Sequence, residues 1–461
     1  MTCDTLGPRP LIPIVMSMLA LSACATPDLD AAFRDLGQLV DARLPGPVTW
    51  RTGGPEDAAV DARIQTILKN PLTAELASKV ALLNNRELQA RYADLGIAQA
   101  DLVQAGLLQN PVLEVMLSPS SGSGTNIELG LMQNFVDLLM RPARQKIAKA
   151  EYESVRLELA AHLVSFMSEV QVAYYAYLGA QESHAVTAEI EETERDAADL
   201  STAFYRAGNI SEREHTEHLA AAADAMAERY QSEQDMRARR GALAGVLGLS
   251  PVGNWSAPSR LSPMPEQSIR LSGLEDRAVK ERFDLAAHRS ELHASLEELG
   301  FEKDFRLVEE MGLAISGERE PDGEWLIGPT LEIPLPIFDQ GQARVSAATL
   351  AVRGMRDRLL AEERQVRSDV ILESEALSLS RTRATHLGAV VLPLREDVVR
   401  LTLAEYNYML EGPFHLLEAQ QETNETYRQY VIALTDYWIA RVKLRAAIGG
   451  GAFEAKLGDV S

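Results

Sequence analysis

The residue pattern best suited to chemistry is "EHTEH", residues 214 to 218, with two histidines one helical turn apart. Histidine and carboxylate side chains are zinc ligands, so Glu214, His215, Glu217 and His218 could hold a metal ion. Their order is not the HExxH of metalloproteases, and the segment falls at a predicted turn between helices. The other histidines are scattered, and no Gly-rich phosphate loop, Gly-x-Ser-x-Gly elbow or catalytic Cys pair is present. The sequence therefore predicts no metal site, no catalytic cofactor and no enzyme.

Composition narrows the protein class further. The formal net charge of −22 disfavours a nucleic-acid partner, because such a chain repels phosphate and shows no basic stripe. An apolar content of 46% excludes wholesale disorder. No uninterrupted apolar run approaches the roughly 20 residues of a membrane-spanning helix. The negative charge serves either solubility or an acidic lumen, and composition alone leaves both open.

The N-terminus is predicted to carry an export signal. A 13-residue apolar segment, Leu11 to Ala23, is too short to span a membrane and ends in small residues. It runs into "LSAC", Leu21 to Cys24, which has the form of a lipoprotein signal. Residues 1–23 are therefore predicted to be removed and Cys24 to carry fatty acyl chains such as palmitate. An ordinary signal peptide followed by an incidental cysteine is the alternative.

Two long rods dominate the rest of the chain. Residues 143–250 contain no proline and show apolar residues at helical spacing, with one interruption at "RAGNIS". A second rod starts near Ala343, passes Pro393, breaks at "LEGPFH" and continues to "AAIGG". Proline removes a backbone donor and crowds the preceding turn, so we expect a kink at Pro393.

The rods belong to an internal repeat. "LSTAFYRAGN" matches "LTLAEYNYML" at an offset of 201, and "ELQARYADL" matches "DLAAHRSEL" at an offset of 197. The chain is predicted to consist of six parts: a signal peptide at 1–23, an anchor and periplasmic or equatorial segment at 24–69, a first repeat at 70–250, a linker at 251–281, a second repeat at 282–450 and a tail at 451–461.

Each repeat also contains a pair of alternating segments, which predict strands at about 110–118, 125–136, 304–316 and 325–338. Four strands form no closed sheet, and free edges are prohibitive in lipid, whereas three chains would supply a twelve-strand barrel. The apolar face would then meet lipid. Its predicted members are Phe305, Leu307, Leu313, Ile315, Ile127, Leu129 and Trp325. The alternative is a soluble, half-buried sheet packed on helices.

At this level the chain resembles the TolC-type outer-membrane efflux proteins, from roughly residue 70 to residue 450. The resemblance rests on the doubled layout and on the order of several motifs: "NNRELQARYADLGIAQADLVQAGLLQNP", "YRAGNIS", "LGLSP", "RFDLAAHRSEL", "LEIPLPIFDQGQAR" and "AEYNYMLEGPFHLLEAQ". Several branches of the family are lipoproteins with a signal like the one here.

The resemblance implies a fold and a function. It implies a mainly α-helical protein with a membrane β-sheet that assembles as a homotrimer. The twelve-strand β-barrel of the trimer would lie in the outer membrane of a Gram-negative bacterium and continue into a periplasmic α-helical barrel. It also implies a passive exit duct of a tripartite efflux or type I secretion system. The expected partners are two further copies, a periplasmic adaptor, an inner-membrane transporter of the RND or ABC type, and outer-membrane lipid.

The resemblance also locates a gate at the periplasmic tips. In the family, acidic side chains at two positions just after the glycine of the last tip constrict the pore. In this sequence the inner position is Glu418, and the first position, acidic in the family, is His415. The repeat offset carries these onto Glu217 and Glu214. The tip turns are expected at Gly208 and Asn209 and at Gly412 and Pro413. Three copies of such carboxylates would form rings that favour cations, although solvated tip residues would show the same pattern.

Two alternatives of other classes stay open from sequence. One is a periplasmic coiled-coil lipoprotein that is tethered by Cys24 and never spans the membrane. The other is a degenerate duct that no longer engages a pump, because "EGPF" replaces the more usual glycine tip. The sequence leaves the cargo open, because drugs, metal ions and secreted polypeptides all pass through ducts of the family it resembles. Its scattered methionines form no metal-type cluster that would indicate a copper duct.

Overall fold

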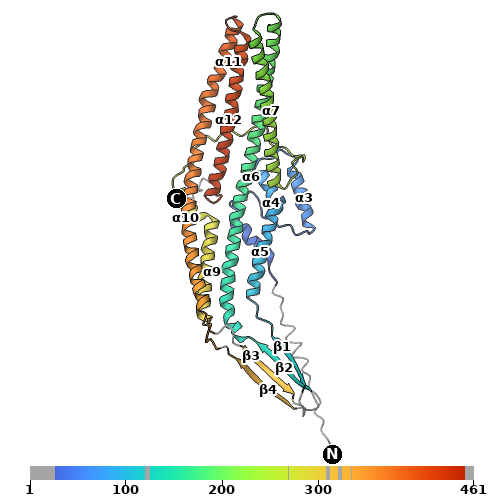
Figure 1. Ribbon diagram of the computed structural model, residues 1–461, viewed down its shortest axis with the longest axis vertical. Helices are drawn as coiled ribbons and strands as arrows, with labels where there is room; N and C mark the ends of the chain where they lie inside the picture. Colours follow the sequence, from blue (N-terminus) through green and yellow to red (C-terminus); the bar gives the residue numbers. More distant parts are fainter. Residues whose placement is uncertain are drawn as a thin grey trace, which may run out of the picture.

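The computed structural model describes residues 26–119, 125–267, 269–307, 312–319, 324–333 and 335–451. The molecule is elongated, with a small sheet at one end and the tips of long helices at the other (Figure 1). The predicted signal peptide, Cys24 and nearly all of the predicted tail lie outside the described residues. No helix in the described ranges combines the length and the apolar character needed to cross a membrane.

The long helices form where the sequence predicts rods. The longest is α6, whose 72 residues reach about 108 Å at 1.5 Å per residue. It starts where the Asn134 side chain accepts hydrogen bonds from the amides of Val136 and Asp137, which satisfies donors that a helix start leaves free. The rods and their flanking helices are α5 (Arg86–Ala105), α6 (Phe135–Arg206), α7 (Glu212–Leu247), α9 (Phe283–Phe305), α10 (Gln342–His386), α11 (Leu392–Asn407) and α12 (Pro413–Ala447).

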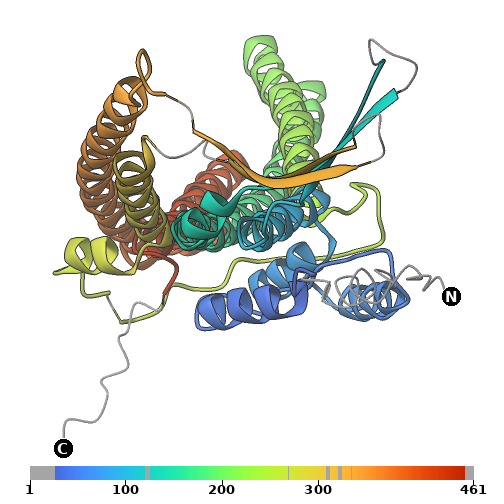
Figure 2. The same cartoon turned by 90° about the horizontal axis from the view of Figure 1, so that it is seen from below.

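Seen from below, the rods form an arc (Figure 2). Its order is α7, α6, α12, then α10 and α11, so α7 and the α10–α11 rod are its two edges. The shorter helices α2 (Leu29–Val40), α3 (Glu56–Ile67), α4 (Ala74–Asn84) and α8 (Leu274–Glu281) lie around the middle of the molecule. The N-terminal helices cover the convex side of the arc.

The contact between α6 and α12 is close because glycine permits it. A Cβ at Gly179 would lie 2.1 Å from the Thr435 hydroxyl oxygen, well inside any real contact. Leu163 on α6 and Tyr437 on α12 are fully buried in the same core. Burying a leucine of this kind is worth about 1.5–3 kcal/mol. The first and second repeats are therefore joined along their long helices.

The sheet is antiparallel, in the order β1–β2–β3–β4. Its strands are β1 (Val112–Pro119), β2 (Thr125–Gln133), β3 (Gly312–Arg319) and β4 (Trp325–Glu332). β2 pairs with β3, so the central pair joins the two repeats. β1 and β4 are the outer strands, and no other described strand pairs with the outer side of either one.

One predicted strand boundary is wrong. Phe305 is the last residue of α9, and Leu307 lies in the turn that follows, so neither belongs to a strand. Apolar residues at Phe301 and Phe305 also satisfy a helical spacing of four, and their rings lie 5.2 Å apart. β3 begins at Gly312, and residues 308–311 of the predicted strand lie outside the described ranges. β2 and β4 end earlier than expected, at Gln133 and Glu332.

The tips repeat the same backbone turn. At the first tip Gly208 takes a left-handed φ of 74°, and the Asn209 amide donates to the Phe204 carbonyl at 2.9 Å. At the second tip Met409 takes φ 60°, and the Leu410 amide donates to the Glu405 carbonyl at 2.9 Å. The two turns lie 201 residues apart. The left-handed residue of the second tip is thus Met409, while Gly412 is the N-cap of α12 and Pro413 its first residue.

Pro393 is accommodated by a π turn. The helix η1 (Leu387–Val391) precedes α11, and the Leu392 amide donates to the Leu387 carbonyl, five residues back. The starts of corresponding strands lie 200 residues apart, whereas the tips lie 201 apart. A π turn holds one extra residue in a helix. Just before Pro393, where a kink is expected, a widened turn therefore takes up a one-residue difference between the repeats.

The middle of the molecule ties helix ends together. Asn84 donates to the carbonyls of Leu247 and Gly248, at 3.0 and 2.7 Å, which caps α7. Arg43 of the N-terminal segment donates to the carbonyls of Glu281 and Gly449, beside the second repeat, at 2.8 and 2.9 Å. Its guanidinium also lies 3.8 Å from the ring centroid of Phe283. The N-terminal segment thus holds together the junction where α12 ends and α9 begins.

Candidate functional site

The sheet presents one face that is almost wholly apolar. Residues directly opposite each other in an antiparallel pair share a face, so the register assigns every strand position. The exposed apolar members of this face are Leu113, Val115, Leu117, Leu129, Leu131, Ile315, Trp325, Ile327 and Leu331. Large exposed apolar patches mark contacts with lipid or protein. Leu129, Ile315 and Trp325 of the predicted lipid-facing set lie on this face. The strand register puts the positions of Ile127 and Leu313 on the same face, but their side chains are outside the description.

The opposite face carries the charge. Glu114, Glu128 and Glu332 occupy it, and the hydroxyls of Ser316 and Thr330 lie 2.9 Å apart. Apolar Val112, Met116 and Leu326 interrupt it. Among the described side chains of these strands, this face holds no lysine or arginine. The sheet thus separates an apolar surface from an acidic one.

The tips carry the predicted gate residues, all of them exposed or half-buried. Glu418 and His415 lie in the first two turns of α12, and His415 pairs with Glu411. Glu217 pairs with Arg213 on the first α7 turns. Glu214 lies in the N-terminal turn of α7, where its amide donates to the Ser211 hydroxyl at 3.2 Å. Among the described residues, no hydrogen bond or ion pair joins any two of these four predicted gate residues.

The two histidines of "EHTEH" make different contacts. The His215 ring stacks on Tyr205 with centroids 5.0 Å apart, and its Nδ1 lies 3.0 Å from the Ser201 hydroxyl. The His218 ring stacks on Phe414 of α12, with centroids 4.4 Å apart and planes 18° from parallel. No group of three potential metal ligands occurs among the described residues. The aromatic partners therefore account for both rings.

Sequence reasoning missed the aromatic junction between the tips. Phe414 of α12 receives the edge of Phe204 of α6 at 5.6 Å and the face of His218 of α7. Glu194 on α6 lies nearby and is buried. Burial raises the pKa of this carboxyl, against the opposing effects of His218 and of a hydrogen bond from Gln421. The available signal was an aromatic residue beside each tip: Phe204 lies just before the first turn and Phe414 just after the second.

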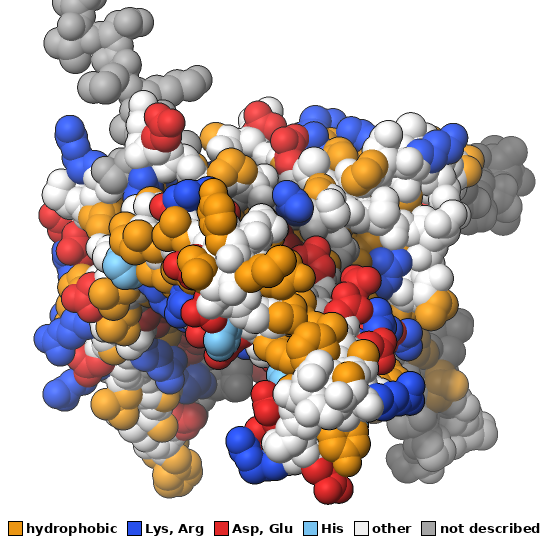
Figure 3. Space-filling model, turned by 90° about the horizontal axis from the view of Figure 1, so that it is seen from above, with side chains coloured by type: hydrophobic (Ala, Val, Ile, Leu, Met, Phe, Trp, Pro, Cys, Tyr) orange, Lys and Arg blue, Asp and Glu red, His pale blue; other side chains and the backbone are white. Residues whose placement is uncertain are grey.

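The tip end also exposes apolar side chains. Viewed from above, hydrophobic groups lie among acidic and basic ones, with histidines at the surface (Figure 3). The residues of the second turn, Tyr408, Met409 and Leu410, are 80%, 93% and 73% exposed. At the first tip, the positions equivalent to Met409 and Leu410 are occupied by Gly208 and Asn209. The two tips therefore differ in character although their backbones match.

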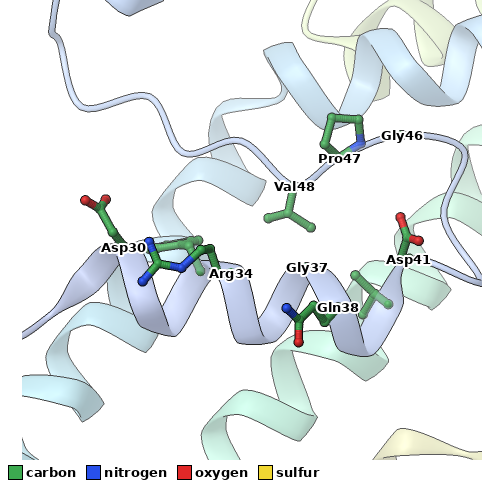
Figure 4. A pocket seen from close by; sticks show the side chains of 10 residues that line it. Asp30, Arg34, Gly37, Gln38, Asp41, Gly46, Pro47 and Val48 are labelled. Carbon is green, nitrogen blue, oxygen red and sulfur yellow. The ribbon is translucent and has the colours of Figure 1, made fainter.

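A groove of about 660 Å³ lies beside α2, away from both ends. Figure 4 shows Asp30, Arg34 and Gln38 along the helix and Pro47 and Val48 on the loop that crosses it. It is open and mixes charged with apolar groups. Nothing in its lining forms a catalytic arrangement.

Comparison with known proteins agrees with this architecture. The family described as outer membrane efflux protein matches residues 77–249. The cobalt-zinc-cadmium resistance protein CzcC of Cupriavidus metallidurans is 25% identical over 395 residues, which cover 82% of this chain and 90% of CzcC.

Solved structures share the fold. The Campylobacter jejuni CmeC outer membrane channel superposes with a TM-score of 0.69 at 14% identity, over 88% of this chain and 91% of CmeC. A membrane protein from Pseudomonas aeruginosa gives 0.67 at 19% identity, over 88% and 98%. CusC gives 0.66 at 16% identity, over 88% and 97%.

The predicted fold class is confirmed: the chain is mainly helical with a four-strand sheet, the protomer architecture of trimeric channels with a β-barrel and a helical barrel. Such relatives indicate the outer membrane of a Gram-negative bacterium. Their family consists of channels rather than enzymes. The match of residues 77–249 to the outer membrane efflux protein family, together with the similarity to CzcC and to the solved channels, identifies an outer-membrane exit channel of the TolC type, as found in tripartite efflux systems.

Proposed function

We propose that three copies of this chain close into one duct, anchored by a lipid on Cys24, through which an inner-membrane pump with its periplasmic adaptor expels metal cations. The observation that carries the proposal is the two-faced sheet, in which no strand of the described part of the chain pairs with the outer sides of β1 and β4. In lipid an open edge leaves backbone groups without partners, whereas a closed barrel has no edge. Pairing β4 of one copy with β1 of the next removes all such edges.

The segment after β4 supports this closure. Pro334 and Pro336 lack the backbone donor that would continue a strand ladder. The side chains of Ile333, Leu335 and Phe338 are nevertheless exposed in the single chain. When β4 pairs antiparallel with a neighbouring β1, this segment runs beside the neighbour's residues 107–111, where Leu107 and Leu108 are also exposed. Apolar packing between copies would then replace the hydrogen bonds that proline removes.

The helical layer has matching edges. At one edge α7 exposes Leu219, Met226 and Tyr230. At the other edge exposed apolar residues recur every three or four positions, namely Val390, Leu394, Val398 and Leu401. Such spacing places them on one helical stripe. A head-to-tail contact between these two edges closes into a ring when the rotation per copy allows it.

Docking of the adaptor is assigned to the second tip. Tyr408, Met409 and Leu410 project apolar surface at the end farthest from the sheet. Exposed apolar groups of this kind mark protein contacts. The polar first tip would then contribute less to adaptor binding.

Metal cations are the proposed cargo because CzcC bears the name of a cobalt, zinc and cadmium resistance protein. The acidic face of the sheet agrees with positively charged cargo, since three copies would repeat Glu114, Glu128 and Glu332 around the barrel. Deleting the gene should lower tolerance to zinc, cobalt and cadmium salts. If tolerance to organic compounds falls instead, the cargo proposal fails and the duct proposal stands.

The decisive experiment is the mass of the detergent-extracted particle by light scattering. Three protomers are expected per particle. A monomer that leaves the membrane without detergent once Cys24→Ser removes the anchor would support the tethered periplasmic alternative. Labelled palmitate should enter the wild-type protein and not the Cys24→Ser variant.

A further inference from the structure

The long helices of the two repeats are buried to different extents. Val170 of α6 and Val370 of α10, which lie 200 positions apart, are both buried. Ala160 of α6 is buried too, whereas Leu360 of α10, again 200 positions on, is 49% exposed. Among the described elements, α6 contacts α9 and α12 of the other repeat in addition to its own, while the main contacts of α10 are within the second repeat and with α8 beside it. A side of α10 that corresponds to a covered side of α6 is therefore exposed.

The other edge of the arc shows the same difference. Val431 of α12 lies one turn before Thr435, which faces Gly179 of α6, and Val431 is buried. Tyr230 of α7 stands 201 positions earlier, at the spacing of the tips, and is 56% exposed. Each edge therefore exposes apolar side chains at positions that are covered where the two repeats meet.

The charges of the two edges also match. Where the repeats meet, the rings of Tyr175 on α6 and Trp438 on α12 stack with centroids 5.2 Å apart. The position 200 after Tyr175 holds Glu375 on α10, and the position 201 before Trp438 holds Arg237 on α7. Both side chains are exposed, and Arg237 also pairs with Glu233 of its own helix. Opposite charges are the complement that a head-to-tail contact between copies needs.

The sheet supplies an independent register. β2 pairs with β3 so that Met132 lies opposite Ala314. β4 begins 200 positions after β2, and β3 begins 200 positions after β1. The equivalent pairing of β4 with β1 of another copy therefore sets Glu332 opposite Glu114. Both belong to the acidic face, so each face of the sheet continues across this contact. Two glutamate positions already oppose each other in β2 and β3.

We propose that the seam between neighbouring copies repeats the contact between the two repeats of one chain. In this seam Glu332 lies opposite Glu114 of the next copy, and Glu375 pairs with Arg237 of the next copy. The inference rests on the proposed trimer and adds the register in which its copies meet.

The seam differs from the internal contact in its width. Gly179 of α6 lets Thr435 of α12 approach closely, but the corresponding residue of α10 is Leu379, which is 71% exposed. A leucine there holds the two helices of the seam further apart. The charged pair of the seam is then within reach of solvent, so salt weakens the contact between copies. The apolar contact inside the chain has no such dependence.

Cysteine pairs test the strand register on the detergent-purified full chain. In one chain Glu114 and Glu332 are three strand spacings apart, about 14 Å, which is too far for a disulfide, so a bond between these positions joins two copies. Under mild oxidation Glu114→Cys with Glu332→Cys should give disulfide-linked oligomers up to the trimer, and neither single variant should. The matched control is Met116→Cys with Glu332→Cys, displaced by two residues on the same face. It should cross-link about five-fold less, because diagonal neighbours lie further apart.

Two outcomes would overturn this register and leave the proposed duct standing. One is more linkage in the displaced pair than in the predicted pair. The other is no linkage in either pair of a particle that light scattering shows to be trimeric. A monomeric wild-type particle would overturn the duct and the seam together.

Charge exchange tests the helical part of the seam. Glu375→Arg and Arg237→Glu should each raise the dissociation constant of the trimer about two- to five-fold per seam, the range of an exposed ion pair. The double variant should dissociate less than the two single effects predict together, because the pair is re-formed in reverse. Arg229→Glu is the control, since Arg229 pairs with Glu191 within its own repeat, and its effect should add to that of Glu375→Arg. Full additivity of Glu375→Arg with Arg237→Glu would overturn the proposed pair.

Discussion

At the scale of single residues, the predicted gate can be tested on its carboxylates. Glu418 is exposed near the start of α12, and Glu217 is exposed but paired with Arg213. Removing both charges with Glu418→Ala and Glu217→Ala should raise single-channel conductance and weaken cation selectivity, because rings of carboxylates attract cations. Unchanged conductance and selectivity in planar bilayers would remove these residues from the gate.

The left-handed residue of the second tip offers a stability test. Met409 takes φ 60°, a region that costs a side-chain-bearing residue about 1–2 kcal/mol. Met409→Gly should therefore stabilise the turn by about 1 kcal/mol, measured as the free energy of unfolding in denaturant. Met409→Ala keeps a Cβ in the same conformation and should give no such gain. If the tip binds an adaptor, both variants should bind it more weakly.

A third residue-scale test uses pH. Burial raises the pKa of Asp284, but hydrogen bonds from Arg282 and its charge outweigh burial and hold that pKa below its usual value. A carboxyl with a lowered pKa in the folded state contributes stability above its unfolded pKa and loses it as the pH falls through the folded value. Wild type should therefore exceed Asp284→Asn in stability at pH 7, and the gap should close on acidification. Melting temperatures across pH 7 to 3 measure it, and a constant gap would contradict the assignment.

At the scale of elements, the contact of α6 with α12 depends on Gly179. Gly179→Ala would place a methyl group against Thr435 and should cost about 1–3 kcal/mol, because packed helices must move apart. Gly241→Ala is the matched control in α7, where the added Cβ meets nothing within 4 Å. That change should stabilise by about 0.5–1 kcal/mol, as a mid-helix glycine is replaced. Equal unfolding free energies for the two variants would refute the close contact.

Much of the element pattern follows from local sequence. Long proline-free segments predict α6 and α7, and alternation predicts four strands whose cores lie where expected. The boundary at Phe305 could not be found this way, because its spacing from Phe301 fits a helix while its spacing from Leu307 fits a strand. Which period wins depends on packing partners that lie far away in the chain.

The tips show the same limit. The turn at Gly208 can be predicted from sequence, because glycine tolerates a left-handed backbone conformation. Gly412 suggests a similar role, yet the chain turns at Met409 instead, at the position the repeat offset indicates. The stack of His218 on Phe414 joins residues about 200 positions apart. Periodicity within one segment carries no information on such a contact.

At the scale of the whole molecule, the two helical edges should control assembly. Leu394 on α11 is exposed in the single chain, and a carboxylate there would lose its water if a second copy covered it. Leu394→Glu should therefore convert trimers to smaller species in detergent, as seen by light scattering. Val252→Glu is the control, since Val252 is exposed on the linker rather than on the edge of the arc. Trimers of undiminished stability in Leu394→Glu would place the interface elsewhere.

The continuous helix α6 determines how far the first tip lies from the sheet. It runs from the end of β2 to the first tip without a break, so the distance it spans is set by its residue count. Adding seven residues would carry the tip about 10.5 Å further and rotate it by only about 20°. Adding two or five would turn the tip surface away from its neighbours. Viable length variants of this protein should therefore come in multiples of near-whole turns, matched in both repeats and in the partner that bridges the remaining gap.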